Sequence, residues 1–215
     1  SSDVGGSNND NALGVSVDAA MNAYVTGFTY STNFARSLTN FIAWPSKTNQ
    51  NADVFVIRFD PEGQTNNGYA VVFGGRYNDQ GIAIAVDTNQ NAYVTGLTYS
   101  RTNFAGTDTL LMTNFFTANP ASDFSPTNSS AKKQGVSDVF LVALAPNGTN
   151  LFSAFLGGRE DDQANGIALD LASGPNPVAY LVGTTTSTNF PGTAPGSFHG
   201  KKKYSDAFIG RVEFP

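Results

Sequence analysis

Three aspartates at matching places in the sequence are the first candidates for chemistry. Asp10, Asp79 and Asp162 each lie five residues after the first glycine of a Gly-Gly pair, and an amide or acid precedes each of them. Calcium takes six to eight oxygen ligands, so these residues, together with Asp161 and Glu160, are candidate calcium ligands. The other hypothesis is that each aspartate caps the backbone amides of its own loop, as in Asx turns. No D-x-D-x-D spacing accompanies them, which favours the capping role.

Aspartates at a second set of matching places have a simpler interpretation. Asp18, Asp87 and Asp170 each follow an apolar run and begin a turn. An aspartate in a turn accepts hydrogen bonds from backbone amides that follow it, which stabilises the turn. We therefore expect these three residues to be structural.

The remaining residue types offer few catalytic groups. His199 is the only histidine, so one chain has no second histidine for a metal site or a catalytic base. It lies near the basic run Lys201 to Lys203, which is either a solvated loop or a contact for an anionic surface. The sequence has no G-x-S-x-G, P-loop or H-E-x-x-H motif. Two carboxylates from distant loops could act as a glycosidase pair, but nothing in the sequence selects them.

The composition excludes several classes of protein. The chain has 215 residues and a net charge of −5, so it lacks the clustered positive charge that nucleic-acid binding requires. No apolar run approaches the roughly 18 residues of a membrane-spanning helix. Without cysteine, disulfides and cysteine-ligated zinc are excluded. Because 40% of the residues are hydrophobic, the chain can bury a sizeable core.

Three copies of one unit organise the chain. Residues 22–27 and 91–96 are the same string, Asn-Ala-Tyr-Val-Thr-Gly, and residues 178–183 form a weaker third copy. Each copy also has an upstream Gly-Gly pair, an apolar run that leads to an aspartate, and a downstream Asp-x-Phe string, which begins at Asp53, Asp138 or Asp206. Four landmarks that recur three times in the same order are not a coincidence, so the repeat defines the fold.

Each copy is predicted to form four strands, A to D, because its constant segments are rich in β-branched and aromatic residues. Strand A leads to Asp18, Asp87 or Asp170, strand B contains Tyr24, Tyr93 or Tyr180, strand C covers 53–59, 138–144 or 206–212, and strand D covers 69–73 or 151–156. No segment has the period of a helix. Tight turns join A to B and C to D, so the longer D-to-A and B-to-C loops share the opposite end.

Four-stranded antiparallel units in tandem predict an all-β protein, specifically a β-propeller. A parallel β-helix has much shorter coils, and a sandwich would not carry three near-identical units. We expect one propeller segment over 1–215, with blades at about 7–75, about 76–158 and about 159–215, the third without its last strand. Closed propellers have at least four blades, so we expect an incomplete ring that further sequence or another chain completes.

The repeat resembles a known family, the bacterial β-propeller repeat called SBBP. The resemblance rests on Gly74 to Asp87 with Asn91 to Gly96, and on Phe155 to Gly158, Thr188 to Pro191 and Ser205 to Phe208. It covers nearly the whole chain apart from the long loops, although Ala35 and Ala105 stand where the family usually has proline. It implies a propeller in a secreted, cell-surface or periplasmic bacterial protein, and it supplies no catalytic residues.

Three aromatic residues in the long loops are candidate partner-binding residues. Phe115 and Phe116 lie in an insert from 105 to 137 that is too apolar for an idle linker, and Trp44 lies in the corresponding loop of the first copy. These loops either pack over the edge of their own blade or dock a partner.

Two functional hypotheses follow. The leading one is a non-enzymatic, extracytoplasmic β-propeller module for protein binding, assembly or surface adhesion. Its partner would be another protein or further copies of itself, and it would need no cofactor apart from the calcium considered above. The alternative is a lectin or carbohydrate-active enzyme that uses the loop-rich end, because aromatic and amide side chains suit sugars.

Overall fold

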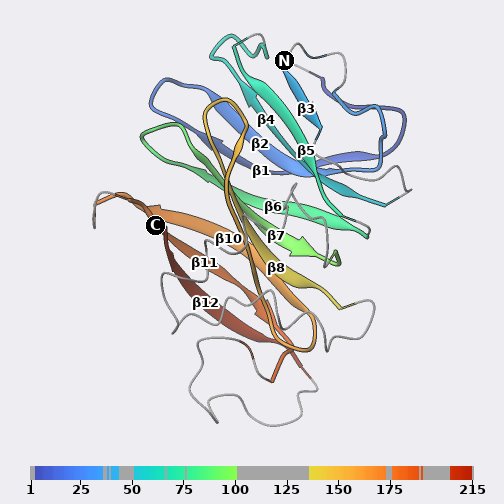
Figure 1. The fold of residues 1–215 in the computed structure, drawn as a ribbon, viewed down its shortest axis with the longest axis vertical. Coiled ribbons are helices and arrows are strands. Elements are labelled where there is room, and N and C mark those ends of the chain that lie inside the picture. Colours follow the sequence, from blue (N-terminus) through green and yellow to red (C-terminus); the bar gives the residue numbers. More distant parts are fainter. Residues whose placement is uncertain are drawn as a thin grey trace.

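Three β-sheets lie one behind the other in a stack (Figure 1). The computed structural model describes residues 3–35, 38, 40–43, 51–65, 67–75, 77–100, 136–172, 176–188, 190 and 204–214. These ranges contain strands and no α-helix, so the prediction of an all-β protein is confirmed. In the same ranges no helix has the length and apolarity to cross a membrane.

Each sheet follows the predicted order of antiparallel strands. Sheet 1 has the order β1-β2-β4-β5-β3, sheet 2 the order β6-β7-β8-β9, and sheet 3 the order β10-β11-β12. The bounds are β1 Asp10–Val17, β2 Ala23–Thr29, β3 Phe41–Ala43, β4 Asp53–Phe59, β5 Tyr69–Phe73, β6 Asp79–Val86, β7 Ala92–Thr98, β8 Asp138–Leu144, β9 Asn150–Leu156, β10 Asp162–Asp170, β11 Val178–Thr185 and β12 Asp206–Glu213. Strands A to D are therefore β1, β2, β4 and β5 in sheet 1, and sheet 3 has strands A to C among the described residues.

Strand β3 was not predicted. It pairs in parallel with β5, with Phe41 opposite Ala70, and so extends sheet 1 beyond strand D. It has only three residues and lies inside a segment that varies in length between copies, so neither alternation nor the repeat marks it as a strand.

The strand register places the two kinds of connection at opposite ends of each sheet. Asp79 pairs with Thr98 and Thr98 pairs with Asp138, so strand A starts where strand B ends and strand C starts. We call this end, with the D-to-A and B-to-C loops, the loop end. At the other end, the turn end, the Asp87 N–H donates to the Asn91 carbonyl and closes the A-to-B turn.

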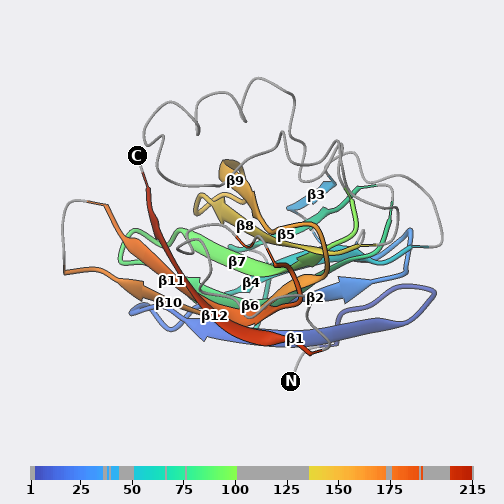
Figure 2. The ribbon, with the colours of Figure 1, turned by 90° about the horizontal axis from the view of Figure 1, so that it is seen from below.

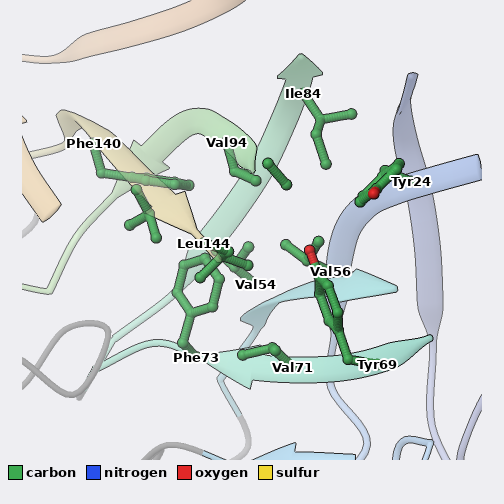
Figure 3. Close-up of a cluster of buried hydrophobic side chains, with 12 residues drawn as sticks. Tyr24, Val54, Val56, Tyr69, Val71, Phe73, Ile84, Val94, Phe140 and Leu144 are labelled. Atoms are coloured by element: carbon green, nitrogen blue, oxygen red, sulfur yellow. The ribbon is translucent and has the colours of Figure 1, made fainter. Parts of the chain in front are cut away.

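Apolar side chains fill the space between the sheets. One core cluster joins Val56 and Phe73 of sheet 1 to Ile84 and Phe140 of sheet 2 (Figure 3). A second cluster, with Leu141 on it, joins sheets 2 and 3. The A strands of the three sheets, β1, β6 and β10, lie along one side of the stack, and β3, β5 and β9 lie along the other (Figure 2). We call the A strands the inner strands. Strand C of sheet 2 is therefore buried on both faces, with Phe140 in the first cluster and Leu141 in the second.

A glycine in strand B lets strand A approach closely at a β-bulge. In sheet 2 the register shifts between Gly81 and Ala83, and a Cβ on Gly96 would lie 2.0 Å from the carbonyl oxygen of Gln80. The equivalent distance is 1.9 Å at Gly27 and 2.0 Å at Gly183. No other residue fits these positions without a backbone shift.

Candidate functional site

The aspartate that opens strand A is the centre of a polar network at the loop end. In sheet 2, the Asp79 side chain has no exposed surface. Its Oδ1 accepts a hydrogen bond from the Thr98 hydroxyl. Its Oδ2 accepts the Ser100 hydroxyl at 2.9 Å and the Gly75 N–H at 2.7 Å. The aspartate thus caps the backbone N–H of the second glycine of the Gly-Gly pair.

The same network occurs in the other two sheets. The threonine hydroxyls of Thr29 and Thr185 donate to Asp10 and Asp162 at 2.5 Å, and the serine hydroxyls of Ser31 and Ser187 donate to the same carboxylates at 3.2 Å and 2.9 Å. The N–H groups of Gly6 and Gly158 complete the two networks. Sequence reasoning missed these hydroxyls, although a Thr-x-Ser string follows strand B in every copy, at 29–31, 98–100 and 185–187.

A second carboxylate lies beside this network at the joint between sheets. A Cβ on Gly74 would lie 2.1 Å from Oδ1 of Asp53 and 2.9 Å from Oδ2 of Asp79. Between sheets 2 and 3, Gly157 has the same relation to Asp138 and Asp162, at 1.9 Å and 2.9 Å. The first glycine of the pair therefore leaves room for one carboxylate from each of two adjacent sheets.

Burial between two sheets changes the acidity of Asp79. Loss of solvent raises the pKa of this carboxyl to about 7, and the nearby charge of Asp53 acts in the same direction. The hydrogen bonds from Thr98, Gly75 and Ser100 oppose the rise, because they favour the ionised form. The carboxylate is sealed from solvent, so it cannot meet a substrate, and its network is structural.

The residue before Asp79 or Asp162 fastens its sheet to the preceding one. The Ala52 N–H of sheet 1 donates to Oδ1 of Asn78 at 2.9 Å, and the Asp79 N–H donates back to the Ala52 carbonyl at 2.8 Å. Between sheets 2 and 3, the Ser137 N–H donates to Oδ1 of Asp161 at 2.8 Å. We call this reciprocal pair of hydrogen bonds the loop-end clamp.

The candidate calcium ligands are not brought together. Asp10, Asp79 and Asp162 lie one in each sheet, each within its own network. Asp161 belongs to the loop-end clamp, and Glu160 is an exposed neighbour in the same loop. In the part of the chain that the structure describes, no three His, Cys, Asp or Glu side chains are placed to hold a metal ion. Calcium binding by these residues stays a prediction.

The aspartates at the turn end stabilise turns, as predicted. Asp87 Oδ1 accepts the N–H groups of Asn89 and Asn91, and its Oδ2 accepts the Asn91 side-chain amide at 2.8 Å and the Tyr93 hydroxyl at 3.0 Å. Asp18 makes the equivalent bonds in sheet 1. Partial burial opposes the ionisation of Asp18, but these hydrogen bonds prevail and hold its pKa below the usual value.

Arg58 of strand C joins sheets 1 and 2 at the turn end. Its guanidinium donates to the Pro146 carbonyl at 3.3 Å and to Oε1 of Gln90 at 3.1 Å, both in sheet 2. It also lies 5.7 Å from the centroid of the Tyr24 ring, within the range of a cation–π contact. Burial raises the pKa of Tyr24 to about 12. We call this arrangement the turn-end clamp.

Identical repeat positions differ in exposure between the middle and the ends of the stack. Ile84 of sheet 2 packs against sheet 1 and is 7% exposed, whereas the equivalent Val15 of sheet 1 is 68% exposed. On the other face, Val56 and Leu141 are at most 1% exposed, whereas the equivalent Ile209 is 79% exposed. The outer face of sheet 1 is defined by Val15 and Val17, and that of sheet 3 by Tyr180, Val182, Ile209 and Arg211.

Several predicted residues lie outside the described residues. These are the partner-binding candidates Trp44, Phe115 and Phe116, together with His199 and Lys201 to Lys203. Their predicted roles are untested.

The comparisons with known proteins concern the repeat. Residues 63–105, which run from the C-to-D turn of sheet 1 through β7, match the family model of SBBP, a beta-propeller repeat. This match confirms the resemblance to the SBBP repeat at residues 63–105. No curated protein matches the chain.

Proposed function

We propose that this chain, with its SBBP β-propeller repeat at residues 63–105, is a non-enzymatic extracytoplasmic β-propeller module for protein binding, assembly or surface adhesion. The observation that carries the proposal is the exposure of Val15 and Ile209 at positions that the same repeat buries between sheets. Further sheets placed on these faces would continue the stack, and four to eight blades would close it. The location outside the cytoplasm follows from the resemblance to the family.

The proposed domain organisation is one propeller segment over residues 1–215. Blade one covers about 7–75 and contains sheet 1, blade two covers about 76–158 and contains sheet 2, and blade three covers about 159–215 and contains sheet 3. Sheet 3 has three strands among the described residues, so one further strand would make blade three equal to the others.

The loop end supports a role in binding. The strands begin and end there on a scaffold that the aspartate networks and the loop-end clamp cross-link by hydrogen bonds, and the sequence between the ends of strands B and C varies in length. Binding residues are commonly carried by loops on such a scaffold. Asp10, Asp79 and Asp162 accept hydrogen bonds within their own sheets, and Asp161 accepts one across a joint, which supports a structural rather than a catalytic role for these four carboxylates.

Hydroxyl-radical footprinting of the protein in its native assembly tests the proposal. Tyr180 is 37% exposed, whereas the equivalent Tyr24 and Tyr93 are at most 4% exposed. If further sheets cover the outer faces, Tyr180 will be oxidised as slowly as Tyr24 and Tyr93. Rapid oxidation of Tyr180 in the assembly would contradict the proposal. So would glycan hydrolysis that is lost when loop-end carboxylates are substituted, because this result would favour a carbohydrate-active enzyme.

A further inference from the structure

We propose that the outer face of sheet 3 docks on the outer face of sheet 1 of a second copy of this chain, head to tail. This inference rests on the proposed function, in which both faces are covered, and it names the occupant. Four sets of residues carry it, because each repeats one half of a contact that already joins two sheets within the chain.

The apolar residues of the two faces match the two halves of an existing core. Ile84 and Val86 of sheet 2 pack on sheet 1, and Val15 and Val17 are their equivalents on sheet 1. On the face of sheet 1 that packs against sheet 2, Thr26 and Val56 are fully buried. The equivalent residues on the outer face of sheet 3 are Val182 and Ile209. At these two positions the outer face of sheet 3 is thus at least as apolar as its buried counterpart, which favours burial of the face there.

The loop-end clamp is also present in two separate halves. In the joint between sheets 1 and 2, Ala52 exchanges hydrogen bonds with Asn78 and Asp79. Ser205 of sheet 3 is the equivalent of Ala52, and it is exposed. Asn9 and Asp10 of sheet 1 are the equivalents of Asn78 and Asp79.

The Gly-Gly pair fits the same arrangement. A Cβ on Gly5 would meet Asp10 at 3.2 Å, whereas a Cβ on Gly74 would also meet Asp53 of the preceding sheet. The equivalent of Asp53 in sheet 3 is Asp206, which is exposed. Head-to-tail docking places Asp206 of one copy beside Gly5 of the next.

The turn-end clamp adds charge complementarity. Arg211 and Tyr180 of sheet 3 repeat the pair formed by Arg58 and Tyr24, and the hydrogen bond that Arg211 donates to Glu213, together with its hydrogen bond to Tyr180, raises the pKa of Arg211. By analogy with Arg58 and Pro146, Arg211 would reach the C-to-D turn of the docked sheet. In sheet 1 this turn is acidic, Asp60-Pro61-Glu62-Gly63, whereas in sheet 2 it is the uncharged Ala145-Pro146-Asn147-Gly148. The first sheet of another copy is therefore a better electrostatic partner for Arg211 than sheet 2 would be.

The shape of sheet 1 favours a three-stranded partner. Between sheets 1 and 2, strand D of the first sheet packs on strand C of the next, as Phe73 does on Phe140 (Figure 3). On sheet 1, the corresponding surface of strand C is already covered, because Leu38 and Phe41 of the same sheet pack on Phe55 and its neighbours. The three strands described for sheet 3 would pack on the part of sheet 1 that stays uncovered, at Val15 and Val17.

The proposed contact joins two different surfaces, so it is heterologous and must close into a ring or grow into a fibre. Two copies joined at both contacts would form a ring of six sheets, within the range of closed propellers. We therefore expect a dimer of a 22.6 kDa chain.

Sedimentation velocity with two face variants tests the inference. Val15→Asp and Ile209→Asp place a charge on an outer face, and both positions are exposed in the single chain, so the fold of each variant should be retained. Each variant should associate at least about tenfold more weakly than the wild type, because the charge must be buried at the contact. Leu151→Asp is the matched control, since Leu151 is an exposed apolar residue on β9 outside both faces, and it should leave association unchanged.

A mixture of the two variants identifies the direction of docking. Val15→Asp retains an intact sheet 3 face and Ile209→Asp an intact sheet 1 face, so only an equimolar mixture should regain a dimer. If the contact joined two identical faces, only one of the two variants would weaken association and the other would behave as the wild type. This result would overturn the inference. A monomeric wild type would also overturn the inference. If Tyr180 is nevertheless protected in the native assembly, other sheets cover the outer faces and the proposed function stands. If Tyr180 is exposed in the native assembly, both the inference and the proposed function are wrong.

Discussion

The two ends of the inner strands place an aspartate in opposite electrostatic environments. At the loop end, Asp79 is enclosed between sheets 1 and 2, and its pKa rises to about 7. At the turn end, Asp18 accepts comparable hydrogen bonds from a tyrosine, an asparagine and backbone amides, yet its pKa falls below the usual value. Both carboxylates are well supplied with donors, so hydrogen bonding alone does not distinguish them.

Burial under a neighbouring sheet accounts for the difference. Asp18 remains close to solvent and organises only its own turn. Asp79 loses solvent, lies beside Asp53 of the adjacent sheet, and organises a joint between two sheets. Asp18 is therefore a local cap, whereas Asp79 is part of the stacking that the proposed function requires.

The largest expected effect is the loss of the loop-end acid inside the stack. Asp79→Ala leaves the Gly75 N–H without its acceptor in a sealed environment, and it leaves the Thr98 and Ser100 hydroxyls only backbone carbonyl oxygens at 3.2 Å, so we expect a loss of about 3–5 kcal/mol in the free energy of unfolding. Asp10→Ala should cost only about 1–2 kcal/mol, because water can reach its partners at the open face. Urea denaturation of both variants measures the two losses. Equal losses would show that burial between sheets is not the deciding factor.

The pH dependence of stability sharpens the comparison. Because the folded pKa of Asp79 is raised from 3.8 to about 7, its contribution is fully present below pH 3.8 and is lost as the pH rises through 7. We expect a loss of about 2–4 kcal/mol between pH 4 and pH 8, corrected for other groups by comparison with Asp79→Asn. Asparagine can donate to Thr98, whose hydroxyl also lies 3.2 Å from the Ser100 carbonyl, so it mimics the protonated acid. Urea denaturation of both proteins across this range should show a flatter profile for Asp79→Asn, and an unchanged slope would contradict the assignment.

The bulge beside the loop end gives the next effect. Gly96→Ala would place a methyl group 2.0 Å from a backbone carbonyl, so strands A and B must separate locally, at an expected cost of about 2–3 kcal/mol. Gly210→Ala is the control, because its nearest neighbour would be the end of a leucine side chain at 3.4 Å, and it should change stability by less than about 1 kcal/mol. Thermal unfolding of the two variants provides the measurement. A tolerated Gly96→Ala would mean that the bulge adapts freely.

The repeat made most of the fold predictable. Matching the segments around Tyr24, Tyr93 and Tyr180 gave the strands and their order, and Asp87 was recognised as a turn residue because its partners are close in the sequence. Strand β3 was missed because a three-residue parallel strand depends on the neighbouring β5 rather than on a local pattern.

The loop-end network was only half predictable. The capping role of Asp79 was anticipated, but the distant hydroxyl of Thr98 was not, although the Thr-x-Ser string recurs. The approach of Asp53 to Asp79 could not be read from the chain, because it depends on how one sheet stacks on the next. Burial of the joint also depends on stacking, so the raised pKa of Asp79 was equally beyond the sequence.

The smallest effects belong to the turn end, where the third copy provides an internal test. Asp87 organises two backbone amides, the Asn91 side chain and the Tyr93 hydroxyl, and Asp87→Ala should cost about 1–2 kcal/mol. In sheet 3, Val178, which has no side-chain amide, stands where Asn91 does, and the turn is four residues longer. Asp170→Ala should therefore cost less than half as much, as measured by urea denaturation of the two variants. A larger loss at Asp170 than at Asp87 would mean that the turn acids, like those at the loop end, act through contacts beyond their own hairpin.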